Sequence, residues 1–214
     1  MQKLSAYCSF INERVSVANL DKNTYISTEN MLPNKEGISC SEGLPTTTQT
    51  KAYQGKDVLI SNIRPYFRKI WHADRNGGCS NDVLVLRAKD NCYPKFLYYL
   101  LSDDNFFYYA TATAKGTKMP RGDKNALMQY EVPHLPIYIQ IKIADVLSAL
   151  DARIVINKKI NHHLTEPISA TDSSPDIKRG KRVSRRIVRA LFSCSNSSCC
   201  SKIGLQTDVN SIRL

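Results

Sequence analysis

Residues 139–166 read IQIKIADVLSALDARIVINKKINHHLTE, and this stretch has the most regular pattern in the chain. Its seam positions follow one another at alternating intervals of four and three residues, which is the heptad repeat of a coiled-coil helix. The seam consists of Ile143, Leu147, Leu150, Ile154, Asn157, Asn161 and Leu164. Such a helix is on the order of 40 Å long, enough to act as a spacer. We predict one long coiled-coil helix over residues 137–166, with the two seam asparagines fixing its pairing register.

Shorter apolar runs typical of strands precede the helix. The runs at 58–60, 70–71 and 83–86 predict a small mixed or antiparallel sheet. Residues Asn76–Gly78 predict a turn between the last two runs. The first 50 residues predict a short helix or strand followed by loops.

Two helices and a loop are expected between the sheet and the long helix. Residues 95–101 are too densely apolar for a half-exposed strand, and 103–105 supply a cap for a second helix that begins near Phe106. The polar stretch 116–123 predicts a loop, and 130–133 predicts a short extended piece. We therefore predict an α+β fold, with a globular domain at 1–136 before the long helix.

The residues after Pro167 differ in composition from the rest. They carry nine lysines and arginines against three acidic residues, which leaves 21 against 16 in residues 1–166. Serine, cysteine and basic runs dominate, without apolar periodicity. We predict a poorly ordered basic tail over 167–214, and removing it should leave the fold intact.

Composition also limits the class of protein. The formal net charge is +11, which favours an anionic partner. Seven cysteines without framework spacing indicate reduced thiols in a cytosol. No apolar leader segment and no run of 18 apolar residues occurs. We expect a cytoplasmic chain that is not bound to a membrane.

Taken in order, several stretches resemble the target recognition domain and the following helix of type I restriction-modification specificity subunits. The resemblance covers about residues 1–166. It rests on GKDVLISNIRPYFRK at 55–69, CSNDVLVL at 79–86, GTKMPRGDK at 116–124, EVPHLP at 131–136 and the helix at 141–161.

The resemblance implies a protein that binds double-stranded DNA and has no catalytic site. Such subunits normally carry two recognition domains joined by two helices, which set the spacing and bind the methyltransferase subunits and, through them, the restriction subunit. This sequence has one domain and one helix. Either a truncated or frameshifted gene or a genuine half-subunit fits that pattern, and we favour the first. A half-subunit could form a homodimer through the helix and bind a palindromic split site.

Two basic groups are candidates for DNA contact. The first comprises Arg64, Arg68 and Lys69, in a turn where Pro65 predicts extended backbone at Arg64. The second lies in the glycine-bearing loop and comprises Thr117, Lys118, Arg121 and Lys124. The alternative is a solvated or salt-bridged loop for the first group and a structural loop packed on the helix for the second. The aromatic residues at 98–99 and 106–109 predict core packing in preference to base stacking, because no lysine or arginine is interleaved with them.

No motif for catalysis, metal binding or cofactor binding is found. The chain has no P-loop, no glycine-rich dinucleotide motif and no Asn-Pro-Pro-aromatic methyltransferase motif. Its cysteines and histidines lack zinc-site spacing. We expect no metal and no cofactor. Two alternatives to DNA recognition stay open: a coiled-coil assembly protein without DNA preference, as a truncated and non-functional remnant would be, and a stand-alone DNA-modifying enzyme, against which the missing motifs argue.

Overall fold

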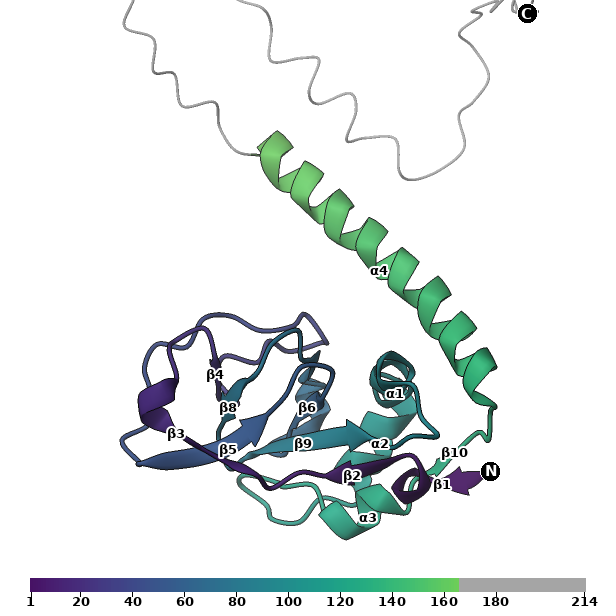
Figure 1. The fold of residues 1–214 in the computed structure, drawn as a ribbon, viewed down its shortest axis with the longest axis horizontal. Helices are drawn as coiled ribbons and strands as arrows, with labels where there is room; N and C mark the ends of the chain where they lie inside the picture. Colours follow the sequence, from purple (N-terminus) through teal and green to yellow (C-terminus); the bar gives the residue numbers. More distant parts are fainter. Residues whose placement is uncertain (166–214) are drawn as a thin grey trace, which may run out of the picture. The chain divides into compact units, whose positions relative to one another are not determined.

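The computed structural model describes residues 1–165, and Figure 1 shows their arrangement. Two four-stranded sheets and one two-stranded sheet are combined with four α-helices in this part of the chain. The strands are β1 (Gln2–Lys3), β2 (Cys8–Phe10), β3 (Arg14–Ser16), β4 (Tyr25–Ile26), β5 (Gln49–Tyr53), β6 (Val58–Ser61), β7 (Ile70–His72), β8 (Gly77–Cys79), β9 (Val83–Ala88) and β10 (Glu131–Val132). The helices are α1 (Pro94–Leu101), α2 (Asp104–Ala112), α3 (Lys124–Met128) and α4 (Ile137–Thr165), with 3-10 turns η1 (Leu4–Ala6), η2 (Val17–Asn19) and η3 (Pro65–Phe67). The predicted α+β class is confirmed.

The central sheet has the order β2-β9-β6-β7 and is antiparallel throughout. Its strand β6 is buried at every position because both faces of the sheet are covered. Successive side chains point to opposite faces, so Val58 and Ile60 join the core beneath the helices, while Leu59 joins the core beneath the second sheet. The apolar run that predicted this strand is continuous for the same reason.

The second sheet has the order β3-β5-β8-β4, and its β4–β8 pair is parallel. The predicted turn at Asn76–Gly78 is wrong, because Gly77–Cys79 forms the strand β8. The two glycines allow close packing rather than reversal: a Cβ on Gly77 would lie 2.6 Å from the Tyr53 hydroxyl, and one on Gly78 would lie 2.7 Å from Thr50 Cγ2. Only a residue without a side chain fits where the strands approach so closely.

The helices α1 and α2 cover the other face of the central sheet. Pro94 opens α1, where its missing N–H costs nothing. Asp103 caps α2 by accepting a hydrogen bond from the Asn105 N–H, so α2 begins two residues before the expected Phe106. Phe106 and Phe107 are buried in the helix-side core, and Tyr98 and Tyr99 pack against it, as predicted. The prediction is wrong for Tyr108, which is 62% exposed because it lies on the outer face of α2.

The short helix α3 was not predicted. Asp123 caps it by accepting from the Asn125 N–H at 2.9 Å, and Leu127 buries its apolar side. Only five residues long, it lacks the two turns needed to show helical periodicity in sequence.

The first half of α4 packs against α1. Gln140 is fully buried there; its side-chain amide donates to the Asn91 and Leu135 carbonyls at 3.1 and 2.8 Å and accepts from the Tyr93 N–H at 2.9 Å. One turn later, Ala144 is also fully buried.

The seam of α4 changes environment along its length. Ile143 and Leu147 are half-buried, and further along the Tyr99 hydroxyl donates to Asp151 at 2.7 Å. The remaining seam residues described, Leu150, Ile154, Asn157 and Asn161, are exposed. The side chain of Leu164 and the predicted tail at 167–214 lie outside the described residues. Within residues 1–165, no helix is long and apolar enough to span a membrane.

Candidate nucleic-acid interface

The two basic loops are joined by main-chain hydrogen bonds. Arg64 N–H donates to the Pro120 carbonyl at 2.8 Å, and Gly122 N–H donates to the Asn62 carbonyl at 3.1 Å. Ile63 and Arg121 form an antiparallel bridge between these bonds. The structure therefore brings together two groups that lie far apart in sequence.

The first loop is a tight turn around η3. Arg64 and Arg68 flank it, both with left-handed backbone, at φ 50° and 52°. The expectation of extended backbone at Arg64 is therefore wrong. The preference that a following proline imposes is weak, and here it is overridden by the Arg64–Pro120 bond and by the turn's own Phe67–Arg64 bond at 3.0 Å.

A neighbouring turn holds this loop from the other side. Asn34 N–H donates to the Phe67 carbonyl at 2.9 Å, and Lys35 N–H donates to the Arg68 carbonyl at 3.0 Å. Asn34 and Lys35 also have left-handed backbone. Four non-glycine residues with positive φ thus meet at one place, an arrangement that persists only where surrounding contacts fix it.

The charges of Arg68 and Lys69 are engaged within the protein. Arg68 Nη1 lies 3.2 Å from Asp104, which also binds Lys35 Nζ at 2.7 Å, and the hydrogen bond from Lys35 lowers the pKa of that carboxyl. Lys69 Nζ donates to the Thr28 carbonyl at 2.6 Å. Desolvation lowers the pKa of Lys69.

The residues of the second loop extend into solvent. Thr117, Lys118 and Lys124 are exposed. Arg121 is also exposed, and its Nη2 makes a single contact of 3.1 Å with Asp82. In the described part of the chain, the half-buried Arg64 side chain has no hydrogen bond or ion pair.

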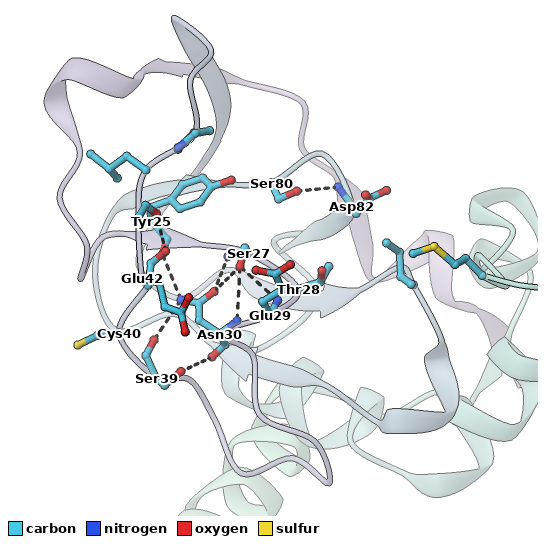
Figure 2. A pocket seen from close by; sticks show the side chains of 16 residues that line it. Tyr25, Ser27, Thr28, Glu29, Asn30, Ser39, Cys40, Glu42, Ser80 and Asp82 are labelled. Atoms are coloured by element: carbon cyan, nitrogen blue, oxygen red, sulfur yellow. Dashed lines mark hydrogen bonds between the residues drawn. The ribbon is translucent and has the colours of Figure 1, made fainter.

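A polar hollow lies beside the joined loops (Figure 2). It has a volume of about 650 Å³, and Ile63, Asp82 and Met119 form its edge toward the basic loops. Inside it, the Asn30 amide donates to the carbonyls of Tyr25 and Ser39 at 3.2 and 3.0 Å. Figure 2 shows this network at the centre of the hollow.

Sequence reasoning missed this hollow. Glu29 and Glu42 line it together with Asp82, so carboxylates stand next to the basic loops. Carboxylates accept hydrogen bonds from the cytosine amino group, and guanidinium groups donate to guanine. Glu29 and Glu42 fall in the first 50 residues, where no periodicity marks them. Asp82 lies in the 79–86 stretch, which carries part of the family resemblance but does not indicate part of a site.

Lys51 fixes the loop that carries Asp82. Its ammonium group is buried and donates to the Asn81 carbonyl at 3.2 Å and to the Val83 carbonyl. Desolvation lowers the pKa of Lys51. The position of Asp82 opposite Arg121 therefore depends on a lysine in the core.

The buried thiols of the described residues are unsuited to catalysis. Burial raises the pKa of Cys8, Cys79 and Cys92 to about 12, so they stay protonated and poorly nucleophilic near neutral pH. In residues 1–165, no three histidine, cysteine, aspartate or glutamate side chains are grouped to hold a metal ion.

Comparison with known proteins gives consistent matches. Residues 11–166 match the family described as type I restriction modification DNA specificity domain. Over 129 residues the chain is 27% identical to the type I restriction enzyme EcoDI specificity subunit of Escherichia coli, covering 60% of this chain and 28% of that subunit.

Solved structures of low identity share the fold. The HsdS subunit from Thermoanaerobacter tengcongensis aligns with a TM-score of 0.59 at 21% identity, over 81% of this chain and 51% of that one. The type I restriction-modification S subunit from M. genitalium aligns with a TM-score of 0.51 at 19% identity, over 76% and 43%. The chain spans about half the length of these structures or less.

Proposed function

Because this chain belongs to the type I restriction modification DNA specificity family, we propose that it binds double-stranded DNA in a sequence-dependent way and is itself non-catalytic. The globular part, residues 1–136, would contact DNA, and the helix at 137–166 would contact protein partners. The observation that carries the proposal is the main-chain pairing of the two basic loops. It places Arg64 and Arg121 on one surface, next to the carboxylates of the hollow.

The candidate residues have distinct roles in this proposal. Thr117, Lys118 and Lys124 are exposed and would contact phosphates, which position the protein without discriminating sequence. Arg64 and Arg121 have guanidinium groups that can donate to guanine edges. Arg121 would exchange its single contact with Asp82 for a base.

Arg68 and Lys69 have a smaller direct role than their charge suggests. Asp104 neutralises part of the charge of Arg68, and Lys69 is committed to the Thr28 carbonyl. Their main effect would be to hold the turn that presents Arg64. They would add to the field that attracts DNA, since a positive potential acts beyond direct contact.

The helix α4 is the proposed site for partners. Leu150 and Ile154 each expose about half of their surface and, with the half-buried Leu147, form an apolar row on the seam that water solvates poorly. In the cell we propose a cytoplasmic complex in which this row binds a methyltransferase subunit and, through it, the restriction subunit. A second copy of the chain is an alternative occupant.

The same row supports a second candidate function, a helix-mediated assembly protein without DNA preference. Mutating Leu147, Leu150 and Ile154 to serine should abolish a homodimer, because each change removes apolar area from the contact. Molar mass from light scattering of the full chain measures this. A dimer of unchanged stability would argue against pairing through this row, and a wild-type monomer would leave the methyltransferase subunit as its partner.

Selection from a random duplex pool tests DNA recognition directly. The full chain is used at about physiological salt, with and without a type I methyltransferase subunit. An enriched short sequence supports the proposal and supplies the target. Binding without enrichment, or no binding under either condition, contradicts sequence recognition and favours the assembly function.

A further inference from the structure

The turn that presents Arg64 also exposes two aromatic side chains. Tyr66 is 47% exposed and Phe67 is 40% exposed, and their rings lie 4.8 Å apart. Met119 of the second loop is 48% exposed and borders the same small hollow as Phe67. We call Tyr66, Phe67 and Met119 the apolar tip.

Aromatic residues of this size stabilise a fold when they are buried. This chain buries Phe106, Phe107 and Tyr53, yet leaves the apolar tip in water. Groups of exposed apolar side chains commonly mark binding surfaces.

The apolar tip is held rigidly. Pro65 is buried beneath it, and the main chain of Phe67 is bonded at both its N–H and its carbonyl, to Arg64 and Asn34. Lys69 Nζ lies 5.8 Å from the centre of the Phe67 ring, covering one face. A rigid aromatic pair loses little conformational freedom on binding.

The surroundings of the apolar tip favour one kind of partner. Arg64 and Lys69 border the hollow next to Phe67, and Lys118 and Arg121 flank Met119 in sequence. Glu29 also lines this hollow, so its two cations outnumber one carboxylate. An apolar group in such mainly basic surroundings is suited to an anion with flat apolar faces. Nucleic acid has that character, with phosphates outside and stacked bases inside.

We infer that Tyr66 and Phe67 act as a wedge that enters a groove of the DNA duplex and partly unstacks one base step, while the exposed Lys118 beside Met119 contacts a phosphate. The inference rests on the proposed DNA-binding function. Unstacking costs a few kcal/mol and is compensated by apolar contact. Flexible pyrimidine–purine steps should be preferred, because they unstack most readily.

The test uses the full chain and the duplex enriched from the random pool, with 2-aminopurine placed at successive positions. Fluorescence of this base rises when it unstacks. We expect a rise at one step with the wild type and no rise with the double variant Tyr66→Ala/Phe67→Ala. The double variant should bind that duplex about 10- to 30-fold more weakly.

Three controls distinguish the wedge from a change in charge or in folding. The salt dependence of non-specific binding should not change, because the aromatic pair neutralises no phosphate. Tyr138→Ala removes an aromatic residue of α4 that is 59% exposed and should behave as the wild type. Tyr66→Leu/Phe67→Leu keeps apolar volume and should retain part of the fluorescence rise, which guards against misfolding of the alanine variant.

Other outcomes overturn the inference. If the wild type binds the enriched duplex but no position brightens, the wedge is wrong and DNA recognition stands. If the wild type brightens one step and the alanine variant does so equally, the unstacking has another cause and the apolar tip serves a protein partner. If no duplex is enriched, the proposed function fails and the wedge fails with it.

Discussion

Two ion pairs of this protein each join an arginine to an aspartate, but they differ in geometry and in burial. Arg87 binds Asp57 through two bonds of 2.8 and 2.9 Å, and Asp57 is 2% exposed. Arg121 binds Asp82 through one contact of 3.1 Å, and its side chain is 57% exposed. The first pair is locked by geometry and burial, whereas the second can open at little cost. Whether an arginine is structural or available for a ligand therefore depends on how deeply its carboxylate partner is buried.

The largest expected effect breaks the locked pair. Arg87→Met should lower the free energy of unfolding by about 3–5 kcal/mol, because it leaves a buried carboxylate without its partner. Urea denaturation measures the loss. Arg75→Ala is the matched control, since its ion pair with Asp74 is exposed, and it should change stability by less than about 0.5 kcal/mol. Equal effects of the two substitutions would remove the distinction between locked and open pairs.

DNA binding tests whether Arg121, in the exposed ion pair, is available to a ligand. Arg64→Ala/Arg121→Ala should weaken binding to the enriched duplex by about 10- to 100-fold, because guanidinium contacts to bases discriminate sequence. Non-specific binding should fall less, and the unfolding free energy should stay within about 0.5 kcal/mol. Fluorescence anisotropy on both duplexes provides the measurement. Equal losses on the two duplexes would assign both arginines to phosphates.

A smaller effect is expected at the lysine beneath Asp82. Lys51→Met leaves two carbonyls without their donor and should cost about 1–2 kcal/mol of stability. The sign of the pH effect follows from the lowered pKa of Lys51: the unfolded chain binds this proton more tightly, so raising the pH toward the ordinary value of 10.5 favours the folded state. Compared with the variant, the wild type should gain stability over that window in parallel urea titrations. Identical pH profiles would contradict the assignment.

The smallest effect is expected when Asp82, the carboxylate partner of Arg121, is replaced. Asp82→Asn frees Arg121 from its ion pair and removes a negative charge from the proposed DNA-binding surface, so non-specific binding should tighten by a few-fold, or about 0.5–1 kcal/mol. Asp74→Asn, which removes a more exposed charge from the pair with Arg75, is the control. A loss of affinity in Asp82→Asn would show instead that the carboxylate itself contacts the DNA.

The sequence predicted elements whose pattern is local. The strand β6 and the helix α4 follow from the spacing of their own apolar residues, and Asp103 indicated the start of α2. The strand β8 could not be predicted, because Gly77 and Gly78 are required by neighbours distant in sequence. The same holds for Arg64, whose backbone is set by Pro120.

In the candidate site, too, only the features that depend on local sequence could be predicted. Residue type identified the basic loops, and the pairing of those loops needed the fold. Sequence could not show that Arg68 and Lys69 are engaged, since Asp104 and Thr28 reach them from other elements. The roles of all seven basic-loop candidates in binding stay predictions until the experiments above are done.

The two-stranded pair β1–β10 has a further consequence. Gln2 pairs with Val132, and Lys3 pairs with Glu131 (Figure 1), so the strand that opens the globular part lies against the strand that leads into α4. The first and last strands of the globular part are therefore neighbours in one two-stranded sheet. A unit closed in this manner can be exchanged as a whole: a recombination event with breakpoints in this strand pair would replace the entire globular part, including the proposed DNA-binding surface, and leave α4 unchanged. If the proposed function holds, new target preferences would then arise without changes in the helix.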